Sequence, residues 1–133
     1  MHPVLRDPSL FKQYACASGE WIAAASGEVL AVTDPADGMP LGTVSSLSAA
    51  EAEQAVATAA VAMDSWKKEP AIKRSAILRR WYELIIANTD DLSAILTAEQ
   101  GKPLKEAAGE IAYAASYIEW YASEALQIGR AHV

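Results

Sequence analysis

Residues 96–107 read Leu-Thr-Ala-Glu-Gln-Gly-Lys-Pro-Leu-Lys-Glu-Ala and lie between two stretches of helix-forming sequence. Glycine commonly terminates a helix and proline is favoured in a first turn, so one helix should end at Gly101 and the next begin at Pro103. Beyond Pro103, apolar residues recur at alternating spacings of four and three. This periodicity predicts a long amphipathic helix whose buried seam contains Leu104, Ala108, Ile111, Ala115, Ile118, Ala122 and Ala125.

A helix over residues 49–66 is predicted by the spacing of Ser48 and Glu51. These residues form a capping box, in which each side chain bonds a backbone amide that the first turn leaves free. The helix carries one stripe of mostly small apolar residues. The stripe consists of Ala52, Val56, Ala59, Ala60 and Met63.

Two more helices are predicted between this one and Gly101. Pro70 is suited to a first turn and begins a helix that runs to about Asn88. Thr89 has a hydroxyl suited to capping the helix that follows, and Asp90 and Asp91 favour its positive end. The expected buried residues are Ile77, Leu78, Trp81, Leu84 and Ile85 in the first of these helices and Leu92, Ile95 and Leu96 in the second.

The chain before Ser48 holds most of the glycines and prolines and several short β-branched runs. After a helical turn in residues 8–14, we expect Trp21-Ile22 to pair with residues 29–32 across a turn near residues 25–27. Leu41–Val44 would add a third strand after the turn at Asp34-Pro35-Ala36-Asp37-Gly38. The predicted fold class is therefore α+β, with a three-strand hairpin region followed by four helices.

Composition limits the functions open to this chain. Its 133 residues allow one domain, and 28 of them are alanine, which buries little area per residue. The balance of 11 Lys and Arg against 17 Asp and Glu gives a net charge of −6, which disfavours nucleic acid and anionic membrane surfaces. Cys16 is the only cysteine, so it forms no intrachain disulfide. A cytoplasmic protein is expected.

No familiar catalytic motif is found among the residues. The sequence lacks the common glycine-rich nucleotide motifs, the HExxH zinc motif and the GxSxG nucleophile motif, and its two histidines lie at opposite ends. Four aromatic residues crowd the last predicted helix. They form either a wall packed against a neighbour or the rim of a ligand channel. They are Tyr113, Tyr117, Trp120 and Tyr121.

The pentad Glu99-Gln100-Gly101-Lys102-Pro103 and its flanks closely resemble a segment near the start of the aldehyde dehydrogenase superfamily. The order of elements agrees, including the Asp-Pro turn, Leu-Gly-Thr-Val at residues 41–44 and a helix ending at Trp66. Residues 109–122 are most similar to the succinate-semialdehyde dehydrogenase branch. The resemblance covers about residues 8–126. It implies an incomplete part of the α/β cofactor-binding domain, without its central parallel sheet.

Aldehyde oxidation with NAD or NADP is the activity that this resemblance implies. In the family a cysteine thiolate attacks the aldehyde, hydride passes to NAD(P)+, and a glutamate activates the water that releases the acid. Those residues lie downstream of the segment matched here, so no catalytic or cofactor-binding residue is assigned and this chain alone is expected to be inactive. A full-length parent would act on a small aldehyde and form a homo-oligomer.

Two sites are carried over by the resemblance, residue by residue. Tyr113 matches a position that lines the substrate tunnel in relatives, and Trp120 lies two turns further along the same helix. Val32, Thr33 and Glu99 match a structural cation site, where carbonyls and one carboxylate suit a hard ion such as Na+. The alternatives are helix packing for the two aromatic residues and, for Glu99, a helix-end residue that binds nothing.

After Ala125 the resemblance stops. Ile128-Gly129-Arg130-Ala131-His132-Val133 resembles the translation of a sequencing-library adapter, and Gln127 fits the same frame. We therefore expect residues 1–126 to be an N-terminal segment of the enzyme and residues 127–133 a non-native tail, the alternative being a real, divergent C-terminus. Two other functions stay open: a free-standing helical interaction module, and a subunit that joins a separate catalytic chain.

Overall fold

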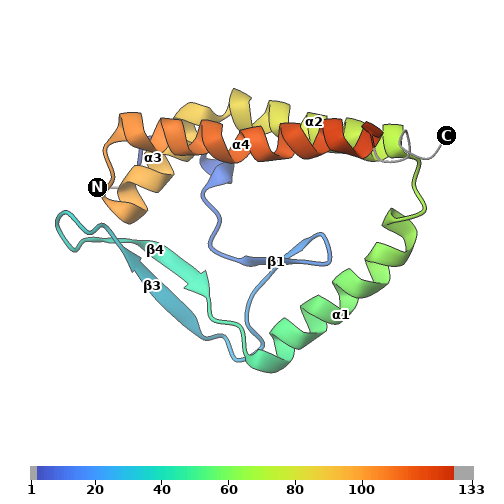
Figure 1. Cartoon of the computed structure of the whole chain (residues 1–133). Coiled ribbons are helices and arrows are strands. Elements are labelled where there is room, and N and C mark those ends of the chain that lie inside the picture. Colours follow the sequence, from blue (N-terminus) through green and yellow to red (C-terminus); the bar gives the residue numbers. More distant parts are fainter. Residues whose placement is uncertain (1–2, 128–133) are drawn as a thin grey trace.

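The computed structural model describes residues 3–127, in which two short hairpins precede four helices (Figure 1). This arrangement confirms the predicted class of a short-stranded region followed by four helices. A single 3-10 turn, Pro8–Leu10, comes first, as expected. The elements are β1 (Ala15–Ala17), β2 (Glu20–Ile22), β3 (Val29–Thr33), β4 (Pro40–Ser45), α1 (Ala49–Trp66), α2 (Ala71–Ala87), α3 (Thr89–Gln100) and α4 (Leu104–Gln127).

The predicted strand pairing is wrong. β2 pairs antiparallel with β1, and β3 pairs with β4, so the described residues hold two separate two-stranded sheets rather than one sheet of three. The reason is the dipeptide Ser18-Gly19, whose φ angles of 56° and 80° make a tight two-residue turn directly before β2. The turn after β3 is as expected, with Gly38 at a φ of 72°.

The helix boundaries follow the sequence signals closely. The capping box of α1 is present, with the Ser48 and Glu51 side chains each bonding the other residue's backbone amide. Gly101 ends α3 at a φ of 74°. The expected cap at Thr89 is wrong. Its hydroxyl donates instead to the carbonyl of Ile86, at 2.9 Å, because the sharp turn between α2 and α3 brings that carbonyl within reach.

The core lies where α2 and α4 run side by side, with α3 packed against α4 (Figure 1). The seam of α4 is confirmed at its centre, where Ala115 and Ala122 are fully buried. Its first turn differs from the prediction: Ala107 is fully buried in place of Ala108, and Leu104 is 56% exposed. Small alanines at these positions let α2 and α4 approach closely. The predicted stripes of α2 and α3 are only partly covered.

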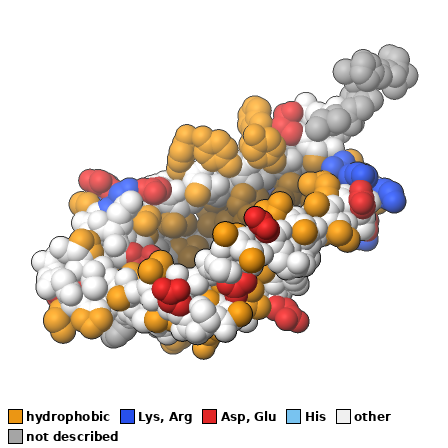
Figure 2. Space-filling model, turned by 90° about the horizontal axis from the view of Figure 1, so that it is seen from below, with side chains coloured by type: hydrophobic (Ala, Val, Ile, Leu, Met, Phe, Trp, Pro, Cys, Tyr) orange, Lys and Arg blue, Asp and Glu red, His pale blue; other side chains and the backbone are white. Residues whose placement is uncertain are grey.

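Helix α1 packs extensively against none of the other described elements. Its predicted apolar stripe is therefore largely uncovered, and Val56 of that stripe is 70% exposed. In Figure 1 α1 runs from the hairpins to the start of α2 without another element beside it. Figure 2 shows hydrophobic side chains gathered in and around a hollow on one face of the molecule. The apolar helix faces that the sequence predicts are therefore only partly buried within residues 3–127.

The expected boundary at residue 127 falls at the end of α4, which includes Gln127. Residues 128–133 of the expected tail lie outside the described residues. No helix between residues 3 and 127 is long and apolar enough to cross a membrane.

Candidate functional site

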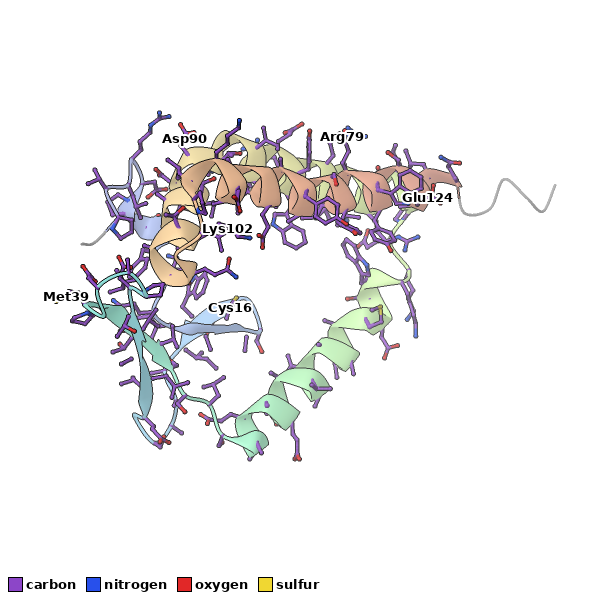
Figure 3. The ribbon with its side chains drawn as sticks, turned by 60° about the vertical axis from the view of Figure 1, so that its left-hand side comes forward. Cys16, Met39, Arg79, Asp90, Lys102 and Glu124 are labelled. Atoms are coloured by element: carbon purple, nitrogen blue, oxygen red, sulfur yellow. The ribbon has the colours of Figure 1, made fainter. Side chains whose placement is uncertain are left out.

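An aromatic row lies along the second half of α4; it consists of Tyr113, Tyr117, Trp120 and Tyr121. Tyr113 and Trp120 are seven residues apart, which places them about two turns from each other on one side of the helix. Both are largely exposed, at 63% and 64%. Ring side chains project from α4 into the open space between α4 and α1 (Figure 3). The row is therefore largely exposed rather than packed into the core of residues 3–127.

Two tyrosines of this row form a close pair. The hydroxyl oxygens of Tyr113 and Tyr117 are 2.5 Å apart and share a hydrogen bond. Their rings meet edge to face, with centroids 5.0 Å apart and planes at 81°. The hydrogen bond to Tyr113 raises the pKa of Tyr117 above its ordinary value of 10.0, and desolvation adds to this. The Tyr117 phenol therefore remains neutral at physiological pH, and the paired hydroxyls can exchange hydrogen bonds with an uncharged or anionic ligand.

An open depression of about 520 Å3 lies over the aromatic row. Its walls combine the rings with two serines and Glu119, which also approaches Arg79 of α2 at 3.9 Å. The sequence selected Tyr113 and Trp120 for substrate access, and both line this depression. Tyr117 and Tyr121 were singled out with them only as members of a packing wall or a channel rim, although the four-residue spacing of Tyr113 and Tyr117 was a signal that they meet. The remaining lining residues are Ser116 and Ser123.

The three residues of the candidate cation site come from β3 and the last turn of α3. The strand pairing is irregular between Val32 and Thr33, which is where a strand changes the direction of its carbonyls. The two elements approach each other just beyond these residues: a Cβ built on Gly101 would lie only 2.9 Å from the Pro35 ring. Glu99 itself is exposed. The donor types, backbone carbonyls and one carboxylate, fit a hard cation.

Other chemistry-bearing groups are dispersed. Cys16 lies exposed on the β1–β2 hairpin, opposite Trp21 (Figure 3). Within residues 3–127 no three His, Cys, Asp or Glu side chains are close enough to hold a metal ion. The described strands pair only antiparallel. The parallel sheet that the resemblance requires for the cofactor is therefore not formed by this part of the chain.

Comparison with known proteins agrees with the order of hairpins and helices. The sequence model of the aldehyde dehydrogenase family matches residues 21–133. The chain belongs to the aldehyde dehydrogenase family. The matched range includes residues 127–133, whose assignment as a non-native tail stays a prediction.

Relatives within the aldehyde dehydrogenase family are similar over most of this chain. It is 52% identical over 124 residues to a glutarate-semialdehyde dehydrogenase of Pseudomonas putida, covering 93% of this chain and 26% of that protein. A succinate-semialdehyde dehydrogenase [NADP(+)] of Escherichia coli is 47% identical with the same coverage. The crystal structure of a Burkholderia pseudomallei succinate-semialdehyde dehydrogenase superposes with a TM-score of 0.88 at 55% identity, over 90% of this chain and 25% of that one. The chain thus spans about a quarter of the length of these relatives.

Proposed function

We propose that this chain is the N-terminal part of an NAD(P)-dependent aldehyde dehydrogenase that oxidises succinate semialdehyde to succinate. The sequence of α4 carries the proposal, since residues 109–122 are most similar to that branch. The names of similar relatives support a shared substrate class. Glutarate semialdehyde, succinate semialdehyde and 3-sulfolactaldehyde all join an aldehyde to a distal acidic group.

The catalytic residues and the cofactor site belong, in this proposal, to the part of the enzyme that residues 3–127 do not include. NAD+ or NADP+ would supply the hydride acceptor for aldehyde oxidation. The two antiparallel hairpins described here are not suited to hold a dinucleotide, which in open α/β sheets binds beyond the carboxyl ends of parallel strands. This chain alone would be inactive for that reason. The full-length enzyme would form homo-oligomers in the cytoplasm.

Tyr113 and Trp120 are assigned to substrate access. The open depression over the aromatic row supports this role, because its rings can contact the methylene chain of a semialdehyde while the Tyr113–Tyr117 pair offers hydrogen bonds. Val32, Thr33 and Glu99 are assigned to a structural cation such as Na+, supported by the approach of Pro35 to Gly101. Neither role involves bond-making steps.

Comparing aldehydes tests the substrate proposal. The full-length enzyme containing this segment should show a kcat/KM for succinate semialdehyde at least about tenfold above that for butanal, a difference of about 1.4 kcal/mol. Glutarate semialdehyde serves as the matched homologue, one methylene longer. A higher kcat/KM for butanal than for both semialdehydes would refute the proposal. A higher kcat/KM for glutarate semialdehyde than for succinate semialdehyde would retain the substrate class and change the substrate.

A further inference from the structure

Residues 4–13 form a strap, the name used here for the segment that connects the start of α3 with β4. In Figure 1 this segment begins beside α3 and descends to the hairpins. None of its residues is buried, and Val4 at its outer end is 92% exposed. Apolar burial is therefore incomplete along the whole strap, so its hydrogen bonds carry much of its attachment to the rest of the molecule.

One end of the strap is fastened by the carboxylate of Asp91. Its two oxygens accept hydrogen bonds from the backbone amides of Arg6, at 3.0 Å, and Asp7, at 2.8 Å. Asp91 is only 6% exposed and lies in the first turn of α3, where the free amides of the helix favour a negative charge. A carboxylate so far removed from water requires hydrogen-bond donors, and the strap supplies two of them.

Gln13 fastens the other end of the strap to β4. Its side-chain oxygen accepts from the amide of Thr43 at 2.9 Å, and its backbone carbonyl accepts from the amide of Ser45 at 3.2 Å. Gly42 leaves room for this approach, because a Cβ built there would lie 2.8 Å from the Gln13 side-chain oxygen and 3.2 Å from the Phe11 ring. The two ends of the strap are thus bonded to different parts of the fold.

The parts that the strap joins have few other connections within residues 3–127. Neither hairpin packs extensively against a helix. The contact of Pro35 with Gly101 involves the turn between β3 and β4. The bond from the Ala25 amide to Glu51 leads to α1, which itself packs extensively against no other helix. The strap is therefore the hydrogen-bonded route from the packed helices to β4.

We propose that the strap is a conformational tie, fastened by Asp91, that holds the β3–β4 hairpin in place relative to α3 and α4. When the two bonds to Asp91 break, the strap and the hairpin loosen together while the helices stay folded. The chemistry of Asp91 suits this role, because one side chain controls both bonds at that end of the strap. The inference goes beyond the proposed function and does not depend on the substrate.

Hydrogen–deuterium exchange of the full-length enzyme containing this segment tests the tie. Asp91→Asn keeps the shape of the side chain but replaces one accepting oxygen by an amide group that only donates. Exchange should accelerate at least about tenfold in residues 4–11 and, because the strap reaches β4, also in residues 40–45. Residues 104–127 of α4 should exchange at the wild-type rate, since the helices stay folded.

Asp90→Asn is the matched control. Asp90 is the neighbouring carboxylate, and its ion pair with the strap joins it to the Arg6 side chain at 2.9 Å. Both side chains are largely exposed, so this surface ion pair should add little to the attachment. Exchange rates in this variant should differ from the wild type by less than about twofold in every peptide. Equal acceleration in the two variants would overturn the role of Asp91.

Gly42→Ala loosens the strap from its other end and leaves Asp91 intact, which keeps the test decisive if Asp91→Asn fails to fold. The added methyl group should displace Gln13 and accelerate exchange in residues 4–11, far from the substitution. Acceleration that stays within the strap in Asp91→Asn, or that extends equally to residues 104–127, would overturn the proposal. Wild-type exchange of residues 4–11 in Gly42→Ala would also overturn it. These outcomes do not depend on which aldehyde the enzyme oxidises, so they are separate from the semialdehyde test.

Discussion

Gly101 is constrained both by its own backbone conformation and by a contact with Pro35, which is distant in the sequence. Its φ of 74° lies in the left-handed region, and a Cβ there would meet the Pro35 ring at 2.9 Å. Gly101→Ala should therefore destabilise the full-length enzyme containing this segment by about 1–2 kcal/mol from backbone strain alone. Gly109 is the matched control, because it lies within α4 with nothing near its missing Cβ.

The two glycine variants should shift urea unfolding in opposite directions. Gly109→Ala should stabilise the full-length enzyme by about 0.5–1 kcal/mol, the usual advantage of alanine in a helix. Gly101→Ala should lower the unfolding midpoint. If both variants shifted the midpoint upward, the contact between the β3–β4 turn and the end of α3 would be disproved.

Tyr113 provides a second prediction at this scale. If it contributes to substrate access, Tyr113→Ala in the full-length enzyme removes contacts that the ground state and the transition state share. KM for succinate semialdehyde should then rise several-fold while kcat changes little. Tyr113→Phe isolates the hydroxyl and its bond to Tyr117. A fall in kcat with KM unchanged would instead place Tyr113 in the chemical step.

At the scale of elements, Glu51 connects α1 to the chain before it. One carboxylate oxygen accepts from the amide of Ala25 at 2.8 Å, and the other accepts from the amide of Ser48 at 2.7 Å. The bond from Ala25, followed by those from Ser48, holds the pKa of Glu51 below its ordinary value of 4.5. A lowered pKa stabilises the folded form above pH 4.5, and this contribution is lost as the pH falls through the lower, folded-state value.

Glu51→Gln should therefore reduce helical content at neutral pH, because glutamine offers one acceptor oxygen where glutamate offers two. Circular dichroism of the dilute chain measures the effect. Glu53→Gln is the control, an exposed glutamate two positions further along α1. The wild type should lose the same helical signal on acidification below pH 4.5, whereas Glu51→Gln should lose less. Equal losses in both variants at neutral pH would show that the link to Ala25 is unimportant.

The helices were predictable and the strand pairing was not, for physical reasons visible in these elements. Capping at Ser48 and termination at Gly101 are local, so sequence spacing suffices to place them. Strand pairing is non-local. The sequence prediction placed the hairpin turn near residues 25–27, whereas the turn that sets the pairing of β2 is Ser18-Gly19. The apolar stripe of α1 was predicted from its spacing, but the spacing does not show whether another element covers it. Periodicity indicates that a helix has an apolar face, and within residues 3–127 no element packs extensively against that face of α1. For the site, Tyr113 and Trp120 came from the resemblance, and the pairing of Tyr113 with Tyr117 required coordinates.

At the scale of the molecule, residues 3–127 leave most of their large apolar side chains uncovered. Within the described residues, the buried apolar side chains are Leu41 and five alanines. Large apolar groups such as Trp81 and Trp120 are more than half exposed. Monomers seldom tolerate contiguous apolar patches beyond a few hundred Å2. The alternative, a free-standing interaction module, requires that residues 1–133 fold cooperatively on their own.

Thermal unfolding of the isolated 133-residue chain in the presence of a hydrophobic dye tests whether the chain alone leaves its apolar surface exposed. We predict helical far-ultraviolet circular dichroism, strong dye fluorescence at low temperature, and a broad, non-cooperative melt or aggregation. The full-length enzyme containing this segment, examined in parallel, should bind little dye and melt sharply. If the isolated chain is a soluble monomer that binds no dye and unfolds in one sharp two-state transition, its apolar surface is not exposed in this way. That result would contradict the proposed function and favour the free-standing interaction module.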